Sequence, residues 1–321
     1  MTVPRFAILT SLALLAIAAI AQEPEGAIPT QVLVHADSKT DVVPTPADIK
    51  FEIDNRVAPL ASLVPIKPSG IQIALLIDDG LSRGAGIQLN DLKAFADAVP
   101  PGTELLVGYM TNGTVRIASP FTTNHAAAAE AIRVPMGVAG QSASPYFCLS
   151  DFVKNWPESG SAGPNSKARV VMMITNGVDP YNGSTRMGNQ DSPYVAAAVS
   201  DAQRAGVAVY SIYYRDAGFS AGGSAPLSGQ GYLQQVADGT GGQSYYEGNG
   251  NPVSLTPYFK QFSHALAETY VATFATDAQA GGREHLVRLK MSSSIPKLKL
   301  HVPDEVRPGN LEAAAGTPAG Q

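Results

Sequence analysis

The chain is poor in cysteine and in charge, and each scarcity excludes a class of protein. Cys148 is the single cysteine among 321 residues, so a scaffold stapled by internal disulfides is excluded. Charged residues make up 15% of the chain and hydrophobic residues 45%, a balance that excludes disorder as the main state. The sequence holds 22 Lys and Arg against 27 Asp and Glu without a basic cluster, so we expect no nucleic-acid partner.

Several catalytic and ligand-binding motifs are also missing from the sequence. It has no Gly-x-x-x-x-Gly-Lys-Ser/Thr loop for nucleotide phosphates and no Gly-x-Ser-x-Gly elbow for a serine nucleophile. The histidines do not follow a metal-binding spacing, and we interpret each as a satisfied or a surface side chain. They are His35, His125, His264, His285 and His301. With no second thiol to pair with, Cys148 is expected to be buried and inert.

The N-terminus has the pattern of an export signal. Arg5 precedes a nearly unbroken apolar run from Phe6 to Ile20, and Ala19-Ile20-Ala21 then offers small residues for cleavage. We therefore predict that residues 1–21 are a signal peptide, which makes the protein exported to the periplasm, the cell surface or the medium. A retained N-terminal anchor is the alternative, although the run is shorter than the roughly 20 residues of a membrane span. No second long apolar run follows, so we expect no span after cleavage.

The rest of the chain divides into a central block and two flanking segments. Residues 22–69 predict a leader and a short β segment, because alternating stretches lie between proline-rich breaks. In residues 70–275, strand patterns alternate with helix patterns, which is typical of a doubly wound α/β sheet. The apolar runs Ile71–Ile77 and Arg169–Ile174 predict central strands buried on both faces. Residues 276–308 predict a C-terminal β extension, and residues 309–321 a disordered tail.

Polar side chains follow the two central strands. Asp78, Asp79 and Ser82 come directly after the first strand, and Asn176 and Asp179 follow the second. In open α/β sheets, ligands bind at the carboxyl ends of the strands, so these loops and loop 137–148 are the candidate site. A turn of this kind, with the Asp78 carboxylate and the Ser82 hydroxyl, can hold a hard divalent cation through oxygen ligands.

The order and wording of these segments resemble a von Willebrand factor type A domain over roughly residues 70–275. The matching segments are Leu75-Leu76-Ile77-Asp78, Val107-Gly108-Tyr109-Met110, Val171–Asp179, Ala205–Ile212 and Ala237–Gly242. Three further short segments resemble those of an exported bacterial group of such domains: Ser144-Pro145-Tyr146, Leu149-Ser150-Asp151 and Asn155-Trp156-Pro157. The resemblance implies a mostly parallel six-stranded sheet, with five parallel strands, one antiparallel edge strand and helices on both faces. We expect small β additions at both ends of this domain.

The resemblance also implies a metal-ion-dependent adhesion site, at which the family holds Mg²⁺ and a partner's acidic group completes the coordination. The family's first motif is Asp-x-Ser-x-Ser, whereas this chain has Asp78, Gly80 and Ser82. The family's loop threonine falls at Ser144, with Ser142 as the other candidate, and its second aspartate falls at Asn176. The expected site is therefore degenerate. Its ligands are Asp78, Ser82, Ser144 and Asn176, and it binds Mg²⁺ or Mn²⁺ weakly or not at all.

Two readings of this loop remain open from the sequence. In the first, Asp79 or Asp179 binds the metal in place of the missing ligands. In the second, here termed the relic turn, the site no longer binds metal and the Asp78 and Asn176 side chains hydrogen-bond backbone amides. We expect an exported, non-enzymatic module that binds another protein through loops 137–148 and 179–192. The alternatives are a Mg²⁺-dependent phosphoryl-transfer enzyme that uses Asp78, and a structural subunit of a cell-envelope complex.

Overall fold

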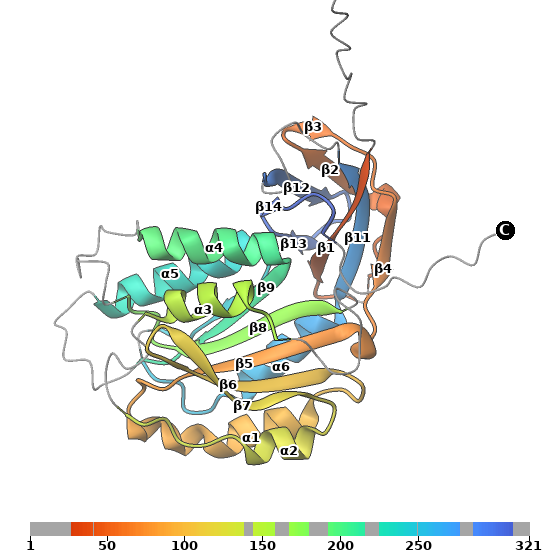
Figure 1. The fold of residues 1–321 in the computed structure, drawn as a ribbon. Coiled ribbons are helices and arrows are strands. Elements are labelled where there is room, and N and C mark those ends of the chain that lie inside the picture. The colour runs from red at the N-terminus through yellow and green to blue at the C-terminus, as the bar shows by residue number, and fades with distance from the viewer. Residues whose placement is uncertain are drawn as a thin grey trace, which may run out of the picture.

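The computed structural model describes residues 27–40, 42–137, 144–157, 167–179, 192–215, 225–248, 250–276 and 285–310. Within these ranges the chain forms two packed units, an α/β unit and a β-sandwich (Figure 1). The predicted signal peptide and most of the predicted tail lie outside the described residues.

The α/β unit is built on one six-stranded sheet with the order β10-β9-β8-β5-β6-β7. Its strands are β5 (Ile71–Asp78), β6 (Glu104–Thr111), β7 (Thr114–Thr122), β8 (Ala168–Thr175), β9 (Val207–Tyr213) and β10 (Ser244–Tyr245). Five strands are parallel, and β7 pairs antiparallel with β6 at one edge. The doubly wound, mostly parallel sheet expected from the sequence is confirmed.

Helices cover both faces of this sheet, which explains why the central strands are mostly apolar along their whole length. Every residue of β5 and β6 is buried, so neither strand shows the alternation of a half-exposed strand. On one face lie α1 (Leu89–Ala98), α2 (His125–Glu130) and α6 (Thr256–Ala267), and on the other α3 (Pro145–Lys154), α4 (Pro193–Ala205) and α5 (Ala225–Thr240). Short 3-10 helices span Pro46–Asp48, Pro68–Gly70 and Arg83–Gln88.

The two flanking segments join into one β-sandwich. One sheet has the order β13-β1-β11-β4 and the other β14-β12-β2-β3. The strands are β1 (Ile28–Asp37), β2 (Ile49–Ile53), β3 (Arg56–Val57), β4 (Ser62–Pro65), β11 (Thr269–Thr276), β12 (Val287–Ser293), β13 (Lys299–His301) and β14 (Glu305–Val306). Phe51 and Phe274, one from each sheet, meet in the shared core with ring centroids 4.7 Å apart.

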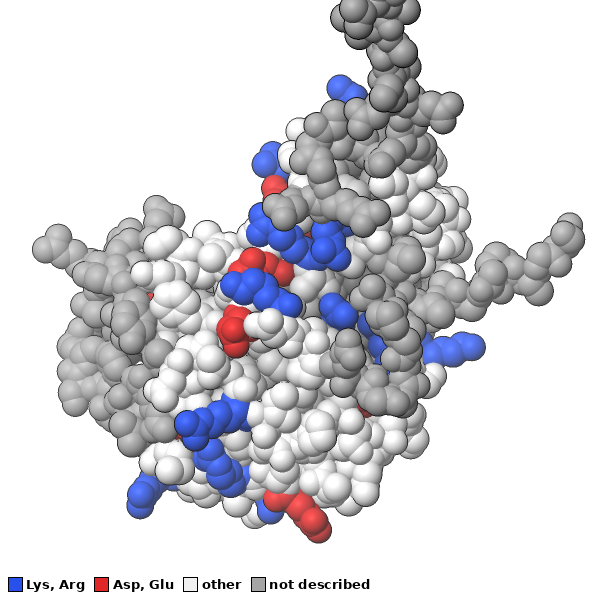
Figure 2. Space-filling model, in the orientation of Figure 1, with Lys and Arg blue, Asp and Glu red and all other residues white. Residues whose placement is uncertain are grey.

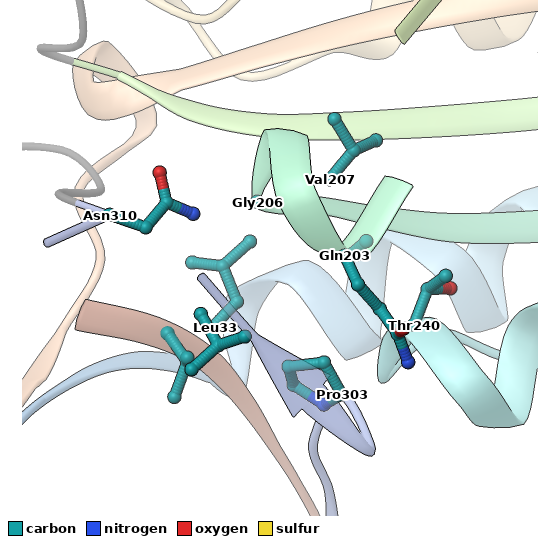
Figure 3. Close-up of a pocket in the computed structure, with 10 residues that line it drawn as sticks. Leu33, Gln203, Gly206, Val207, Thr240, Pro303 and Asn310 are labelled. Carbon is teal, nitrogen blue, oxygen red and sulfur yellow. The ribbon is translucent and has the colours of Figure 1, made fainter. Parts of the chain in front are cut away.

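The α/β unit is therefore inserted between two halves of the sandwich. β11 directly follows α6 in the chain, yet it pairs with β1 from Ile28 opposite Thr276 to His35 opposite Thr269. The sequence-based division at residue 275 placed this strand in the α/β unit, whereas the structure places it in the sandwich. A small cavity of about 20 Å³ lies between the units, with Leu33 and Asn310 on one side and Gln203 and Val207 on the other (Figure 3).

The last helix on the α3 side starts earlier than the sequence suggests. The Gly- and Ser-rich composition of residues 218–231 predicts a loop, with a helix only from Tyr232, but α5 begins at Ala225. Gly229 explains the difference, because a Cβ at this position would lie 2.2 Å from the backbone oxygen of Asn176. The glycine thus lets the helix approach the loop that follows β8.

Candidate functional site

Asp78 ends β5 and turns its carboxylate into the protein. Asp78 is 2% exposed, and its Oδ1 accepts a hydrogen bond from the Gly80 amide at 2.8 Å. Its Oδ2 accepts from the hydroxyl of Thr175 at 2.6 Å. Thr175 ends β8, which pairs in parallel with β5, so the two side chains meet at the same edge of the sheet. Both carboxylate oxygens therefore have donors from within the chain.

Asn176 follows Thr175 and closes its own turn. Its Oδ1 accepts from the Val178 amide at 2.9 Å, and Gly177 adopts a φ of 64° at the bend. The Gly177 amide donates to the Thr175 hydroxyl at 3.1 Å, which links this turn to Asp78. The backbone contacts of Asp78 and Asn176 are those that the relic-turn reading describes.

The two serines of the expected site lie on either side of this edge. Ser144 is fully buried and caps the start of α3, where its hydroxyl accepts from the Tyr146 amide at 3.3 Å. The Tyr146 hydroxyl donates to the Gly177 oxygen at 2.7 Å, which ties α3 to the loop after β8. Ser82 precedes the 3-10 helix Arg83–Gln88 and makes no capping hydrogen bond with its side chain.

Parts of the predicted contact loops lie outside the described residues. Ser142 lies outside the described residues, as do residues 138–143 of the first loop and 180–191 of the second. The described part of the edge consists of the loops after β5 and β8, the start of α3 and residues 131–137 after α2.

The two carboxylates considered as substitutes for missing ligands are also engaged. Asp79 is 2% exposed and binds the Arg133 guanidinium through both oxygens, at 2.7 and 2.9 Å. It also accepts from the Met136 amide at 3.1 Å. Asp179 is buried and accepts from the Ser192 hydroxyl at 2.8 Å. The three carboxylates of this edge are thus buried and hydrogen-bonded within the protein.

Arg133 is the main residue of this edge that the sequence did not single out. Its guanidinium carbon lies 3.8 Å from the centre of the Tyr109 ring, and its backbone amide donates to the Tyr109 hydroxyl at 2.6 Å. The hydrogen-bonded Asp79 carboxylate raises the pKa of Arg133, and burial raises that of Tyr109. Arg133 lies 54 residues from Asp79, and no motif or spacing in the sequence signals the pair.

The Asp78 and Asn176 oxygens that were expected to bind Mg²⁺ accept hydrogen bonds from within the chain in this arrangement. Mg²⁺ needs near-octahedral oxygen ligands, usually including one or two carboxylates with available lone pairs. Here both Asp78 oxygens accept hydrogen bonds, and Asn176 uses its oxygen to close its turn. Within the described ranges, no group of three or more His, Cys, Asp and Glu side chains is placed to hold a metal.

Comparisons with known proteins give matches among solved structures only. No protein-family model matches the chain, and no curated protein does. The structure of a von Willebrand factor type A protein from Catenulispora acidiphila is 11% identical, with a TM-score of 0.42 over 91% of this chain and 76% of that chain. An aerotolerance-related membrane protein from Bacteroides fragilis is 14% identical, with a TM-score of 0.38 over 61% and 98%. The SpRpn10 VWA domain is 10% identical, with a TM-score of 0.36 over 61% and 96%.

The number and direction of the strands in the α/β unit match what the sequence resemblance implied, with five parallel strands and one antiparallel edge strand. The α/β unit thus has the doubly wound, mostly parallel sheet that the resemblance to a von Willebrand factor type A domain implied. At these low identities the likeness concerns the fold alone. In the described part of the chain, no helix combines the length and the apolar character needed to cross a membrane.

Proposed function

We propose that the chain is an exported, non-enzymatic module that binds another protein at the carboxyl edge of its six-stranded sheet, with little or no dependence on metal. The observation that carries this proposal is a group of exposed apolar side chains beside the Asp78 loop. This group, here termed the rim patch, consists of Ile87, Val134, Met136 and Val253, which are 74%, 37%, 54% and 95% exposed.

The rim patch surrounds the 3-10 helix Arg83–Gln88. Both methyl groups of Val134 lie against Gly86, and the Met136 amide binds Asp79. On the other side, the buried Gln88 side chain donates to the backbone oxygens of Pro252 and Val253, at 3.1 and 3.3 Å. The polar contacts thus fix the backbone beneath the patch and leave its apolar side chains in solvent.

This arrangement favours binding to another protein over catalysis. Exposed apolar side chains that gather in one place are typical of protein-interaction surfaces, since their burial against a partner is favourable. The nearby carboxylates accept hydrogen bonds from within the chain, and these donors compete with an ion for the carboxylate lone pairs. The binding energy is therefore expected to come from apolar contact rather than from a bridging metal.

The remaining parts of the proposal come from the sequence and from the surface. Export rests on the signal-peptide pattern of residues 1–21. On the face shown in Figure 2, Lys and Arg are interspersed with Asp and Glu instead of forming a broad basic field, which suits a protein partner better than a phosphate backbone.

The rival proposals are a Mg²⁺-dependent phosphoryl-transfer enzyme and a structural subunit of a cell-envelope complex. For the enzyme, Asp78 would act as the nucleophile, with carboxylate oxygens that accept hydrogen bonds from Gly80 and Thr175. Turnover of a phosphate monoester with Mg²⁺, if abolished by Asp78→Ala, would establish the enzyme. The structural subunit would bind its neighbours equally well when the rim patch is altered.

Affinity capture from an envelope extract tests the proposal with matched variants. The bait is the mature chain as wild type, as the double variant Ile87→Ser/Val253→Ser, and as Val57→Ser, which alters a β3 side chain that is also 74% exposed. We expect a captured protein that is retained by Val57→Ser, lost with the double variant and unaffected by a chelator. Equal capture by all three baits, or capture that requires Mg²⁺, contradicts the proposal.

A further inference from the structure

Three of the five histidines meet where the two units of the chain join. His35 lies near the end of β1 and is 3% exposed, His301 lies on β13, and His264 lies on α6. His35 and His301 are cross-strand neighbours, and their rings stack with centroids 5.2 Å apart and planes 17° apart. β13 and β1 belong to the sandwich, whereas α6 belongs to the α/β unit.

The segment that follows β13 docks onto the α/β unit. The Asp304 amide donates to the Gly239 oxygen near the end of α5 at 3.1 Å. Gly241, with a φ of 77°, lies against Val302 and Pro303, and a Cβ there would be 2.8 Å from the Pro303 nitrogen. His301 thus lies at the start of a segment that contacts both units.

A side-chain hydrogen bond across this junction depends on the protonation of His301. Gln243, between α5 and β10, has its Nε2 3.3 Å from the His301 Nε2, and its Oε1 accepts from the Tyr245 hydroxyl at 3.1 Å. In this orientation of the Gln243 amide, its nitrogen faces His301 as a donor, so His301 presents a lone pair at Nε2. The bond therefore requires a neutral imidazole with its proton on Nδ1.

The other charged groups of the junction do not replace this bond. The Asp37 Oδ2 lies 3.8 Å from the His301 Nε2, and the Asp37 side chain is 47% exposed, so the attraction is screened. The Glu268 Oε2 lies 4.0 Å from the His35 Nε2 and 3.4 Å from the His264 Nε2. Lys299 is the cross-strand neighbour of Asp37, and burial beside Asp238 raises the pKa of Asp304.

We propose that this junction is a proton-sensitive contact, in which protonation of His301 breaks its bond to Gln243 and loosens the docking of the sandwich on the α/β unit. A second proton, on the His301 Nε2, would place two donors opposite each other and put a positive charge on the ring that stacks against His35. Burial and the neighbouring His301 already lower the pKa of His35 to about 4, so the stack disfavours a second charge. Protonation of Asp304 has the opposite effect, because its raised pKa means that its charged form is disfavoured in the folded chain.

Two variants separate His301 from the other acid-sensitive groups. His301→Gln keeps a side-chain oxygen as acceptor but has no group that takes up a proton between about pH 7.5 and pH 4.5. The junction of this variant is therefore expected to respond little to acid. Gln243→Glu replaces the donor by a carboxylate, which attracts a protonated His301 and is expected to reverse the response. Lys299→Gln removes a nearby charge on the same strand and serves as the matched control.

The test measures hydrogen exchange of the Asp304 amide in the mature chain at about pH 7.5 and pH 4.5, corrected for the intrinsic exchange rate. For wild type and Lys299→Gln we expect protection at the lower pH to fall by about tenfold, the equivalent of one hydrogen bond. We expect little change for His301→Gln and a rise for Gln243→Glu. Nitrogen-15 chemical shifts of the wild-type chain show which ring nitrogen of His301 carries the proton. This measurement does not depend on whether a variant folds. A proton on the His301 Nε2 at pH 7.5, or an undiminished acid response in His301→Gln, overturns the proposal.

Discussion

Replacing Arg133 with Met would leave the Asp79 carboxylate buried without its cation. Asp79 is 2% exposed and has two of its three hydrogen bonds from the Arg133 guanidinium. Breaking a fully buried ion pair in this way costs about 3–5 kcal/mol. The Arg133 side chain is 43% exposed, so solvent screens the pair and we discount the loss to about 2–3 kcal/mol. Met preserves much of the contact with the Tyr109 ring.

The expected result is a fall in the melting temperature of roughly 4–12 °C, since 1 kcal/mol corresponds to about 2–4 °C in a chain of this size. Urea unfolding, followed by the fluorescence of the single Trp, gives the free energy of unfolding. A double-mutant cycle with Asp79→Asn gives the interaction energy of the two side chains. The double variant should lose at least about 1 kcal/mol less stability than the sum of the two single losses. Arg83→Met alters an exposed arginine of the same edge and is the control. Additive effects, or a loss below about 0.5 kcal/mol for Arg133→Met, would refute the reasoning.

Three further outcomes follow from buried or tightly packed groups. Cys148 should react with thiol reagents only on unfolding, because burial raises its pKa to about 12; rapid labelling of the native chain at pH 8 would contradict this. Asp91→Ala should cost about 1–2 kcal/mol in urea unfolding, since the Asp91 carboxylate caps the start of α6. The Ser254 hydroxyl chiefly lowers the pKa of Asp91, so this contribution is present above the unfolded pKa of about 4 and should be lost as the pH falls further. Gly229→Ala should be destabilising by about 1–3 kcal/mol because it displaces Asn176, whereas Gly84→Ala, at an exposed site, should change stability little.

The sequence predicted the central sheet because its strands are buried on both faces. A strand such as β5, with every residue buried, reads as a continuous apolar run, and polar residues directly after such a run mark its carboxyl end. Parallel pairing then brings the ends of β5 and β8 together, so the proximity of Asp78 to the Thr175–Asn176 loop follows from the pattern alone. What the pattern could not provide is the direction of the Asp78 side chain, which the Thr175 hydroxyl fixes.

Contacts between distant parts of the chain left no periodic signal. Asp79 and Arg133 come from separate loops, and neither is distinguished by its neighbours in the sequence. The pairing of β1 with β11 requires both ends of the α/β unit to lie close together, which is a property of the folded insert. For the same reason His35, His264 and His301 looked isolated in the sequence, although three separate elements bring them together. The glycines of α5 suggested a loop because their role, close approach to Asn176, depends on a tertiary contact.

The amide at Asn176 is the feature that most directly bears on metal dependence, and Asn176→Asp tests it. An aspartate can accept the same bond from the Val178 amide, so the turn should survive the change. The new carboxylate would join the buried Asp78 and Asp179 at one edge, where like charges repel. We therefore expect a lower melting temperature in chelator and a rise on addition of Mg²⁺ that wild type lacks, because Mg²⁺ binds best where two carboxylates converge.

Asn124→Asp is the matched control for this experiment. Asn124 also closes a turn with its Oδ1, at the start of α2, and an aspartate caps a helix equally well. Thermal melts at constant ionic strength should show the Mg²⁺ effect for Asn176→Asp alone. An equal Mg²⁺ effect in wild type would mean that the native site already binds the ion, and the proposal of metal-independent binding would fail. An equal effect in Asn124→Asp would mean that the added charge, rather than its position beside Asp78, causes the stabilisation.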